Sequence, residues 1–170
     1  MSHNEGTAAS PQMDPAGKKK ALRLLSYGLY VATSRDGDNF AAGTVNWLSQ
    51  CSFDPPLVMA GIKLDSSLHA AIVASRTFAV HVVGKEQRAL ATTFFKAARR
   101  EGDTLSGYRF ETLATGAPVL LDPPAWFECR VVDEIRRGDH TVFVAEVVNA
   151  GVRHDAEPLT LRDTGFSYGG

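Results

Sequence analysis

The stretch Gly43–Ile62, GTVNWLSQCSFDPPLVMAGI, places a cluster of polar side chains between two apolar runs. Its first residues are typical of a strand, and so is the run LVMAGI that follows Asp54-Pro55-Pro56. A plain hairpin would need only a short turn between two such strands. The additional hydroxyl, amide and indole groups therefore predict a surface that holds a flat ligand with polar edges.

Composition limits the classes of partner. The chain has 170 residues with 44% hydrophobic content, which is ordinary for one globular domain. Its 18 basic and 19 acidic residues give a net charge of -1, so no overall field favours nucleic acid or an anionic membrane. Cys51 and Cys129 lie far apart in the sequence and belong to no CxxC or Cys/His pattern, which disfavours a metal site and a disulfide framework.

The N-terminal residues differ in composition from the rest of the chain. Residues 1–17 are rich in small, polar and charged residues and are predicted to form a disordered tail, followed by a single domain over residues 18–170. The tail lacks the apolar core of a signal peptide, and no later apolar run approaches the roughly 18 residues of a membrane span. We therefore expect a cytoplasmic protein that makes no membrane contact.

Strand patterns dominate the remaining chain. Residues 28–35 predict a strand that turns at Asp36-Gly37-Asp38 into a second strand, and residues 136–140, RRGDH, join the two arms of the clearest hairpin. The run at residues 57–62 is apolar throughout and predicts a strand buried on both faces. Further strands are predicted from Phe78 and at PVLLD, residues 118–122.

Helical patterns are fewer and shorter. One helix is predicted over residues 21–26, another is capped by Asp65 or Ser66 with Leu68 and Ile72 on its apolar face, and a third lies within residues 85–102. Residues 103–118 have scattered turn residues and are predicted to be a loop. About seven strands with few helices predict a mainly β fold, a small antiparallel barrel with short helices packed outside it.

The sequence gives little support for catalysis by amino-acid side chains alone. No GxSxG, HExxH, GxxxxGK[ST] or GxGxxG motif is present. A bound cofactor that performs the chemistry fits better, and flavin mononucleotide (FMN) needs a phosphate site, apolar ring faces and polar partners at the ring edge. Ser66 and Ser67 at a helix start, with the cations Lys63 and Lys96, suit the phosphate, and residues 46–52 suit the ring edge.

Several segments in order carry a family resemblance. Residues 43–72, GTVNWLSQCSFDPPLVMAGIKLDSSLHAAI, are followed by SRTFAVHVV, LATTFFK and GDHTVFVAEV. Together they resemble the flavin reductase family of FMN-binding split barrels, over roughly residues 21–152. The resemblance implies a homodimeric antiparallel split β-barrel that holds FMN or FAD near the subunit interface and is reduced by NADH or NADPH. It also implies that His140, in the GDH turn, is the catalytic residue, which orients the nicotinamide or the flavin edge.

Two positions depart from the family pattern. His81 stands where many relatives have Asn, which leaves its role open. Trp47 stands where smaller residues are common, and its indole either strengthens flavin retention or belongs to the dimer interface or the core. Cys51 is interpreted as a small buried residue before any redox role.

The sequence thus predicts an NAD(P)H-dependent flavin reductase, which could supply a partner monooxygenase with reduced flavin. The alternative is a non-enzymatic flavin-binding electron carrier of the flavoredoxin type. No metal and no nucleic acid are expected. The predicted cofactor-binding residues are Thr44, Val45, Asn46, Trp47, Leu48, Ser49, Gln50, Cys51, Ser52, Lys63, Ser66, Ser67, His69 and Lys96.

Overall fold

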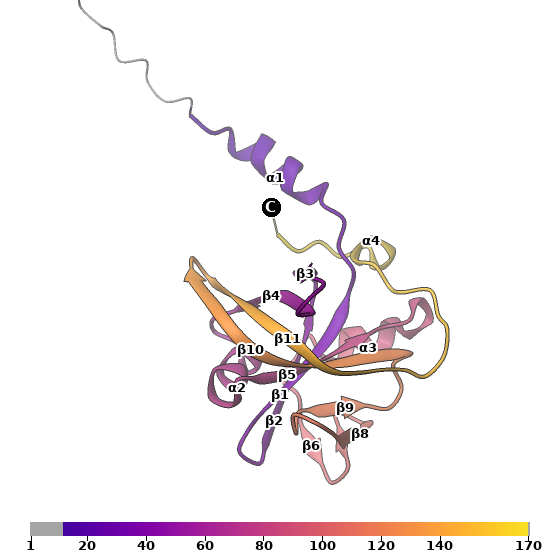
Figure 1. Ribbon diagram of the computed structural model, residues 1–170. Coiled ribbons are helices and arrows are strands. Elements are labelled where there is room, and N and C mark those ends of the chain that lie inside the picture. The colour runs from indigo at the N-terminus through magenta and orange to yellow at the C-terminus, as the bar shows by residue number, and fades with distance from the viewer. Residues whose placement is uncertain (1–11, 170) are drawn as a thin grey trace, which may run out of the picture.

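Antiparallel strands organise the computed structural model, which describes residues 12–169 (Figure 1). Seven strands form one sheet in the order β2-β1-β5-β10-β11-β4-β3, and four short strands form a second sheet in the order β6-β7-β8-β9. The bounds in the large sheet are β1 Tyr30–Asp36, β2 Asn39–Val45, β3 Leu48–Ser52, β4 Leu57–Lys63, β5 Thr77–Val82, β10 Ala125–Arg137 and β11 His140–Val152. The small sheet contains β6 Arg100–Glu101, β7 Thr104–Leu105, β8 Tyr108–Thr112 and β9 Pro118–Leu120. The mainly β, antiparallel class is therefore confirmed.

Both predicted hairpins are present. β1 pairs with β2, and β10 pairs with β11 along most of the length of both strands. The turns contain Gly37 and Gly138 with φ of +58° and +70°, a region that glycine enters without steric cost. Turn chemistry therefore correctly predicted where these strands reverse.

Two strand predictions were wrong. The segment predicted as a loop contains β7 and β8, because Leu105 is fully buried and Phe110 packs on the same apolar cluster. β4 is not buried on both faces, because its side chains alternate and Met59 is 43% exposed. An apolar run alone does not show whether the outer face of a strand is covered.

The helices are α1 Pro15–Arg23, α2 Ser67–Ser75, the 3-10 turn η1 Lys85–Gln87, α3 Arg88–Thr93 and α4 Leu161–Thr164. α1 begins before the predicted position because Asp14 caps it, accepting hydrogen bonds from the N–H groups of Ala16 and Gly17. α1 buries no side chain and projects from the body of the molecule (Figure 1). The remainder of the predicted tail, residues 1–11, lies outside the described residues.

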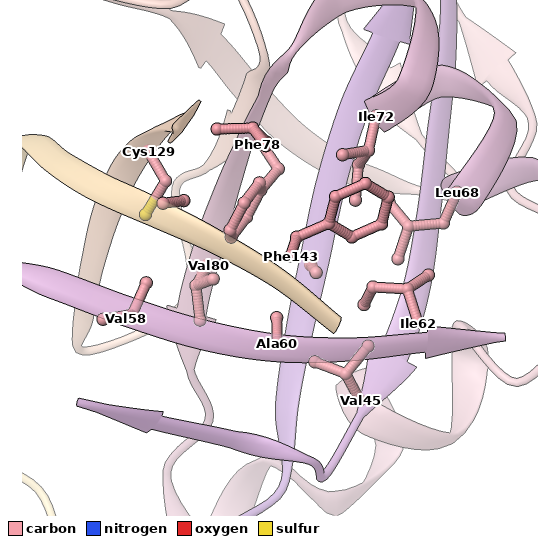
Figure 2. Close-up of a cluster of buried hydrophobic side chains, with 13 residues drawn as sticks. Val45, Val58, Ala60, Ile62, Leu68, Ile72, Phe78, Val80, Cys129 and Phe143 are labelled. Carbon is pink, nitrogen blue, oxygen red and sulfur yellow. The ribbon is translucent and has the colours of Figure 1, made fainter. Parts of the chain in front are cut away.

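The main core lies between α2 and the large sheet (Figure 2). Leu68 and Ile72 of α2 meet Phe143 of β11, and Ile72 and Phe143 have no exposed surface. Ser66 caps the helix as predicted, because its hydroxyl accepts a hydrogen bond from the N–H of His69. The core therefore fixes the N-terminal end of α2 against the strands beside it.

His81 has a structural role. Its Nε2 accepts a hydrogen bond from the N–H of Leu120 at 2.9 Å, so Nδ1 carries the proton and donates to the carbonyl of Val31 at 2.9 Å. The neutral imidazole thus joins β5 to β1 and β9 in the interior. Burial lowers the pKa of His81 from its ordinary value of 6.5 to about 4.

Acid should therefore destabilise the fold through His81. The folded pKa lies below the unfolded one, so the unfolded chain binds the proton more readily between pH 6.5 and about 4. The free energy of unfolding should fall by about 3 kcal/mol over this window. His81→Asn, which cannot make both hydrogen bonds, should be less stable near neutrality but should lack this loss.

Urea denaturation at a series of pH values measures the effect as the difference between wild type and His81→Asn. This difference should shrink as the pH drops from about 6.5 to about 4. A difference that stays constant with pH would show that His81 does not control acid stability.

Candidate active site

A cavity of about 690 Å³ lies where the ends of β2 and β4, the start of α2 and the segment after α4 meet. Its volume falls in the range of roughly 300 to 1,000 Å³ that is usual for sites of small ligands and cofactors. The lining is mostly apolar, with polar groups gathered in a few places. This arrangement suits a ligand with an apolar body and charged or polar ends.

One part of the cavity is suited to an anion. Lys63, Ser66 and Ser67 line it together with Asp65. The first N–H groups of α2 have no partner within the helix, and the helix dipole favours negative charge at this end. The ammonium of Lys63 is 3.1 Å from Asp65, and this hydrogen bond is the main reason that the pKa of Lys63 is raised. An anion bound here would share Lys63 with Asp65.

A second cation and an apolar wall come from the end of α3. The helix ends at Thr93, after which Phe94, Phe95 and Lys96 line the cavity. The Thr44 hydroxyl donates to the carbonyl of Ala91, and its N–H donates to the carbonyl of Phe94 at 3.2 Å. Thr44, a predicted cofactor-binding residue, therefore lies at the cavity, while its side chain and backbone hold β2 against α3.

Two buried donors lack partners where β2 leads into β3. Within the part of the chain that the structure describes, Asn46 Nδ2 and Trp47 Nε1 are the buried side-chain nitrogens or oxygens without a hydrogen bond. An unsatisfied buried polar group costs about 1 to 3 kcal/mol. Asn46 lines the cavity, so a ligand that offers acceptor atoms at this edge would recover part of that cost.

His140 lines the cavity at the first residue of β11 and has a defined orientation. Its Nδ1 lies 2.8 Å from Oδ1 of Asp139, and its Nε2 lies 2.9 Å from the hydroxyl of Tyr168. The ring centroid lies 4.4 Å from that of Trp47. The hydrogen bond from His140 is the main reason that the pKa of Asp139 is lowered. The carboxylate therefore favours the tautomer that carries its proton on Nδ1.

The structure divides the predicted site residues into three groups, of which the third, His69 and Trp47, lies beside the cavity. The cavity brings together Thr44, Val45, Asn46, Lys63, Ser66, Ser67, Lys96 and His140. Leu48, Ser49, Gln50, Cys51 and Ser52 instead form β3 at the edge of the sheet, and they do not line this cavity. Cys51 is exposed, contrary to the expectation that it is buried, because it lies on this edge strand.

His69 and Trp47 lie beside the cavity. His69, a predicted cofactor-binding residue, does not line the cavity and is buried, with its Nε2 2.8 Å from the hydroxyl of Thr141. It turns inward because α2 packs on β11, where its ring contacts Phe143. Trp47 lies behind His140, and Gly61 leaves room for the indole, since a Cβ there would come within 3.1 Å of it.

The sequence interpretation missed the segment after α4. Phe166, Ser167 and Tyr168 line the cavity although they lie at least 70 positions along the chain from the other polar groups of its lining, apart from His140. The available signal was GFSYGG, two aromatic side chains in a glycine-rich segment without a strand or helix pattern.

Over residues 12–169, no group of three or more His, Cys, Asp or Glu side chains could hold a metal ion. None of the helices in the same range is long and apolar enough to cross a membrane.

Comparison with known proteins identifies the family. The model of the flavin reductase like domain matches residues 22–170. The chain belongs to this family. It is 34% identical over 158 residues to an NADH:riboflavin 5'-phosphate oxidoreductase of Streptomyces pristinaespiralis, covering 90% of this chain and 86% of that protein.

Two further relatives allow the fold and the length of this chain to be compared with those of known proteins. The structure of the styrene monooxygenase flavin reductase from Pseudomonas putida S12 superposes with a TM-score of 0.71 and 29% identity, over 84% of this chain and 89% of that one. The predicted split-barrel fold is thereby confirmed. A high molecular weight rubredoxin of Moorella thermoacetica is 32% identical over 83% of this chain, which spans only 62% of that longer protein.

The cavity residues fit a flavin nucleotide. The start of α2 with Ser67, Lys63 and Lys96 would hold a phosphate, and Phe94 offers an apolar face to a ring. The unpaired Nδ2 of Asn46 would donate to the polar ring edge. Flavins present carbonyl oxygens and ring nitrogens along one edge, and these atoms accept such a hydrogen bond.

Removing the anion-binding groups should weaken flavin binding. Ser67→Ala with Lys63→Ala should cost about 1 to 3 kcal/mol of binding free energy, the range for lost charge-assisted hydrogen bonds. Fluorescence titration with FMN measures the change. Lys85→Ala is the matched control, since Lys85 also forms an exposed ion pair, with Glu157 at 2.7 Å, and does not line the cavity. Equal affinity in the double variant and the control would refute this phosphate position.

Proposed function

We propose that the protein is an NADH-dependent flavin reductase that binds FMN in the cavity described above. The observation that carries this proposal is the cavity itself, which combines an anion-binding helix start with an oriented histidine in a chain that matches the family from residue 22 onward. A bound flavin would accept a hydride from the nicotinamide, which leaves as its oxidised form. The protein then has to bind and orient the two partners.

Different residues bind the flavin and orient the nicotinamide. The α2 start and Lys63 bind the phosphate, and Asn46 donates to the ring edge. His140 lies at the mouth of the cavity, where its imidazole orients the nicotinamide, and Asp139 holds that imidazole in one tautomer. Hydride transfer depends on close stacking of donor and acceptor, so this positioning is the main contribution of the chain.

Names of relatives support the choice of nucleotides and of partner. The Streptomyces relative is named for NADH and for riboflavin 5'-phosphate, which is FMN, and this supports both over NADPH and FAD. The Pseudomonas structure is named as the reductase of a styrene monooxygenase. We therefore propose that reduced flavin from this protein serves a separate monooxygenase.

His140→Ala tests the function directly. Stopped-flow measurement under anaerobic conditions should show rapid bleaching of bound FMN by NADH in the wild type and slower bleaching by NADPH. The variant should keep its flavin affinity and reduce flavin about ten- to a hundredfold more slowly, as expected for the loss of one orienting contact. His154→Ala, at an exposed histidine that does not line the cavity, is the matched control.

Two results would contradict this assignment in different ways. If FMN binds to the wild type but NADH does not bleach it, the protein is better described as a flavin electron carrier. If His140→Ala reduces flavin as fast as the wild type, reduction takes place but His140 does not orient the nicotinamide.

The outer face of the large sheet supports a homodimer. Val142 of β11 pairs with Ile135 of β10, and Val144 pairs with Met59 of β4 and with Asp133 of β10. Directly paired residues share a sheet face, so the four apolar side chains form one patch with Asp133 beside it. Ile135 is 55% exposed and Met59 43% exposed, which leaves the patch available to a second copy of the chain.

Charged substitutions in this patch should dissociate the dimer into monomers. Sedimentation at micromolar concentration should give a dimer for the wild type and a folded monomer for the double variant Met59→Glu, Ile135→Glu, because the charges would be buried in the interface. Val152→Glu is the control, at an exposed apolar residue of β11 outside the patch. A folded wild-type monomer loaded with flavin would contradict the dimer, and a dimeric double variant would contradict this interface.

A further inference from the structure

Residues 165–169 lie across one side of the cavity and are called the strap below. The strap begins at Gly165, which ends α4 with φ of +71°, and its Phe166, Ser167 and Tyr168 line the cavity. In Figure 1 the chain runs from α4 past β3 toward α1. The strap therefore lies over a site whose other groups come from the large sheet, α2 and the end of α3.

Few contacts hold the strap. Phe166 packs edge-on against Phe95 with ring centroids 5.3 Å apart, and the Arg88 guanidinium lies 4.9 Å from the centre of the Phe166 ring. Phe166 is 39% exposed and Tyr168 44% exposed. Segments with little buried surface open at low free energy, whereas Thr164, just before the strap, is buried. Gly165 thus separates an anchored residue from a loosely held segment.

Two polar contacts join the strap to distant parts of the chain. The Arg23 guanidinium donates to the carbonyl of Gly169 at 3.4 Å, and the Tyr168 hydroxyl contacts His140. The Tyr168 hydroxyl lies 2.9 Å from His140 Nε2, and its ring lies edge-on to Trp47 at 5.5 Å between centroids. Nδ1 is engaged by Asp139, so in the neutral imidazole Nε2 is the acceptor and the Tyr168 hydroxyl is the donor. Burial raises the pKa of Tyr168, which keeps this hydroxyl protonated.

Both ring nitrogens of His140 are therefore occupied by the protein itself. Asp139 is adjacent in sequence and belongs to the same turn, whereas Tyr168 belongs to the strap. A ligand that is to form a hydrogen bond with His140 must replace one of these two partners. The Tyr168 hydroxyl is the more easily replaced, because its bond is neutral and lies at the cavity, whereas the ionised carboxylate of Asp139 provides a charge-assisted bond.

We propose that Tyr168 competes with the nicotinamide for Nε2 of His140, so that the strap must leave His140 before the nicotinamide contacts it. This inference rests on the proposed function and adds a residue that sets the apparent affinity for the electron donor. When a site is open only part of the time, its apparent affinity for the ligand equals the affinity of the open state multiplied by the open fraction. Loss of the Tyr168 hydroxyl should raise that fraction.

Tyr168→Phe tests the competition with minimal change, since the ring remains and only the hydroxyl is lost. Steady-state kinetics should show a KM for NADH that is about three- to tenfold lower, the equivalent of one neutral hydrogen bond, with kcat within about twofold of wild type. The FMN affinity should not change. Tyr108→Phe is the matched control, because it removes a tyrosine hydroxyl from β8, outside the cavity lining.

A second variant acts on the strap without touching His140. Phe166→Ala removes the edge-on contact with Phe95 and should also lower the KM for NADH. In flavin-free protein, quenching of Trp47 fluorescence by acrylamide should increase in both variants, measured in a Trp126→Phe background that leaves Trp47 as the single tryptophan. This readout does not depend on any reaction with NADH.

The possible outcomes separate the two proposals. An unchanged or higher KM in Tyr168→Phe, together with normal bleaching by NADH in the wild type, would overturn the competition and leave the reductase function standing. Unchanged quenching of Trp47 in both variants would likewise overturn it. Absence of bleaching by NADH in the wild type and in every variant would overturn the reductase function and the competition with it.

Discussion

The pairing of β11 with β4 sets the geometry on which the site depends. His140 at the start of β11 is opposite Lys63 at the end of β4. This register brings the oriented imidazole and the anion-binding start of α2 to the same cavity, although they are far apart in sequence. A slip of one residue would turn His140 to the other face of the sheet. The N–H of Leu64, just after β4, donates to the carbonyl of Asp139 at 3.1 Å, which ties the end of β4 to this register.

The junction of β2 and β3 illustrates how binding groups are maintained at a cost to stability. Asn46 and Trp47 keep buried donors without protein partners, while the surrounding contacts are well satisfied. The N–H of Gly61 donates to the carbonyl of Trp47 at 2.8 Å, and the absence of a Cβ on Gly61 allows the indole to lie close to β4. Local rules of hydrogen bonding are often violated at functional sites, and this junction is consistent with that pattern.

The sequence predicted local features well and long-range burial less well. Asp36-Gly37 and Gly138-Asp139 correctly predicted the hairpins, and Ser66 correctly predicted the start of α2, because turns and caps depend on neighbouring residues. Ser49, Gln50 and Ser52 are polar like Asn46, and only the sheet order shows that they form an edge strand outside the cavity. The contact of Tyr168 with His140 depends on the path of the chain after α4, which no periodic pattern encodes.

A crystal structure of the protein with FMN would show where the flavin binds. We expect density for the phosphate at the start of α2 beside Ser67, with Asn46 Nδ2 within hydrogen-bond distance of an acceptor on the ring edge. Density for FMN against the outer side of β3, at Ser49–Ser52 and away from α2, would refute this position of the flavin.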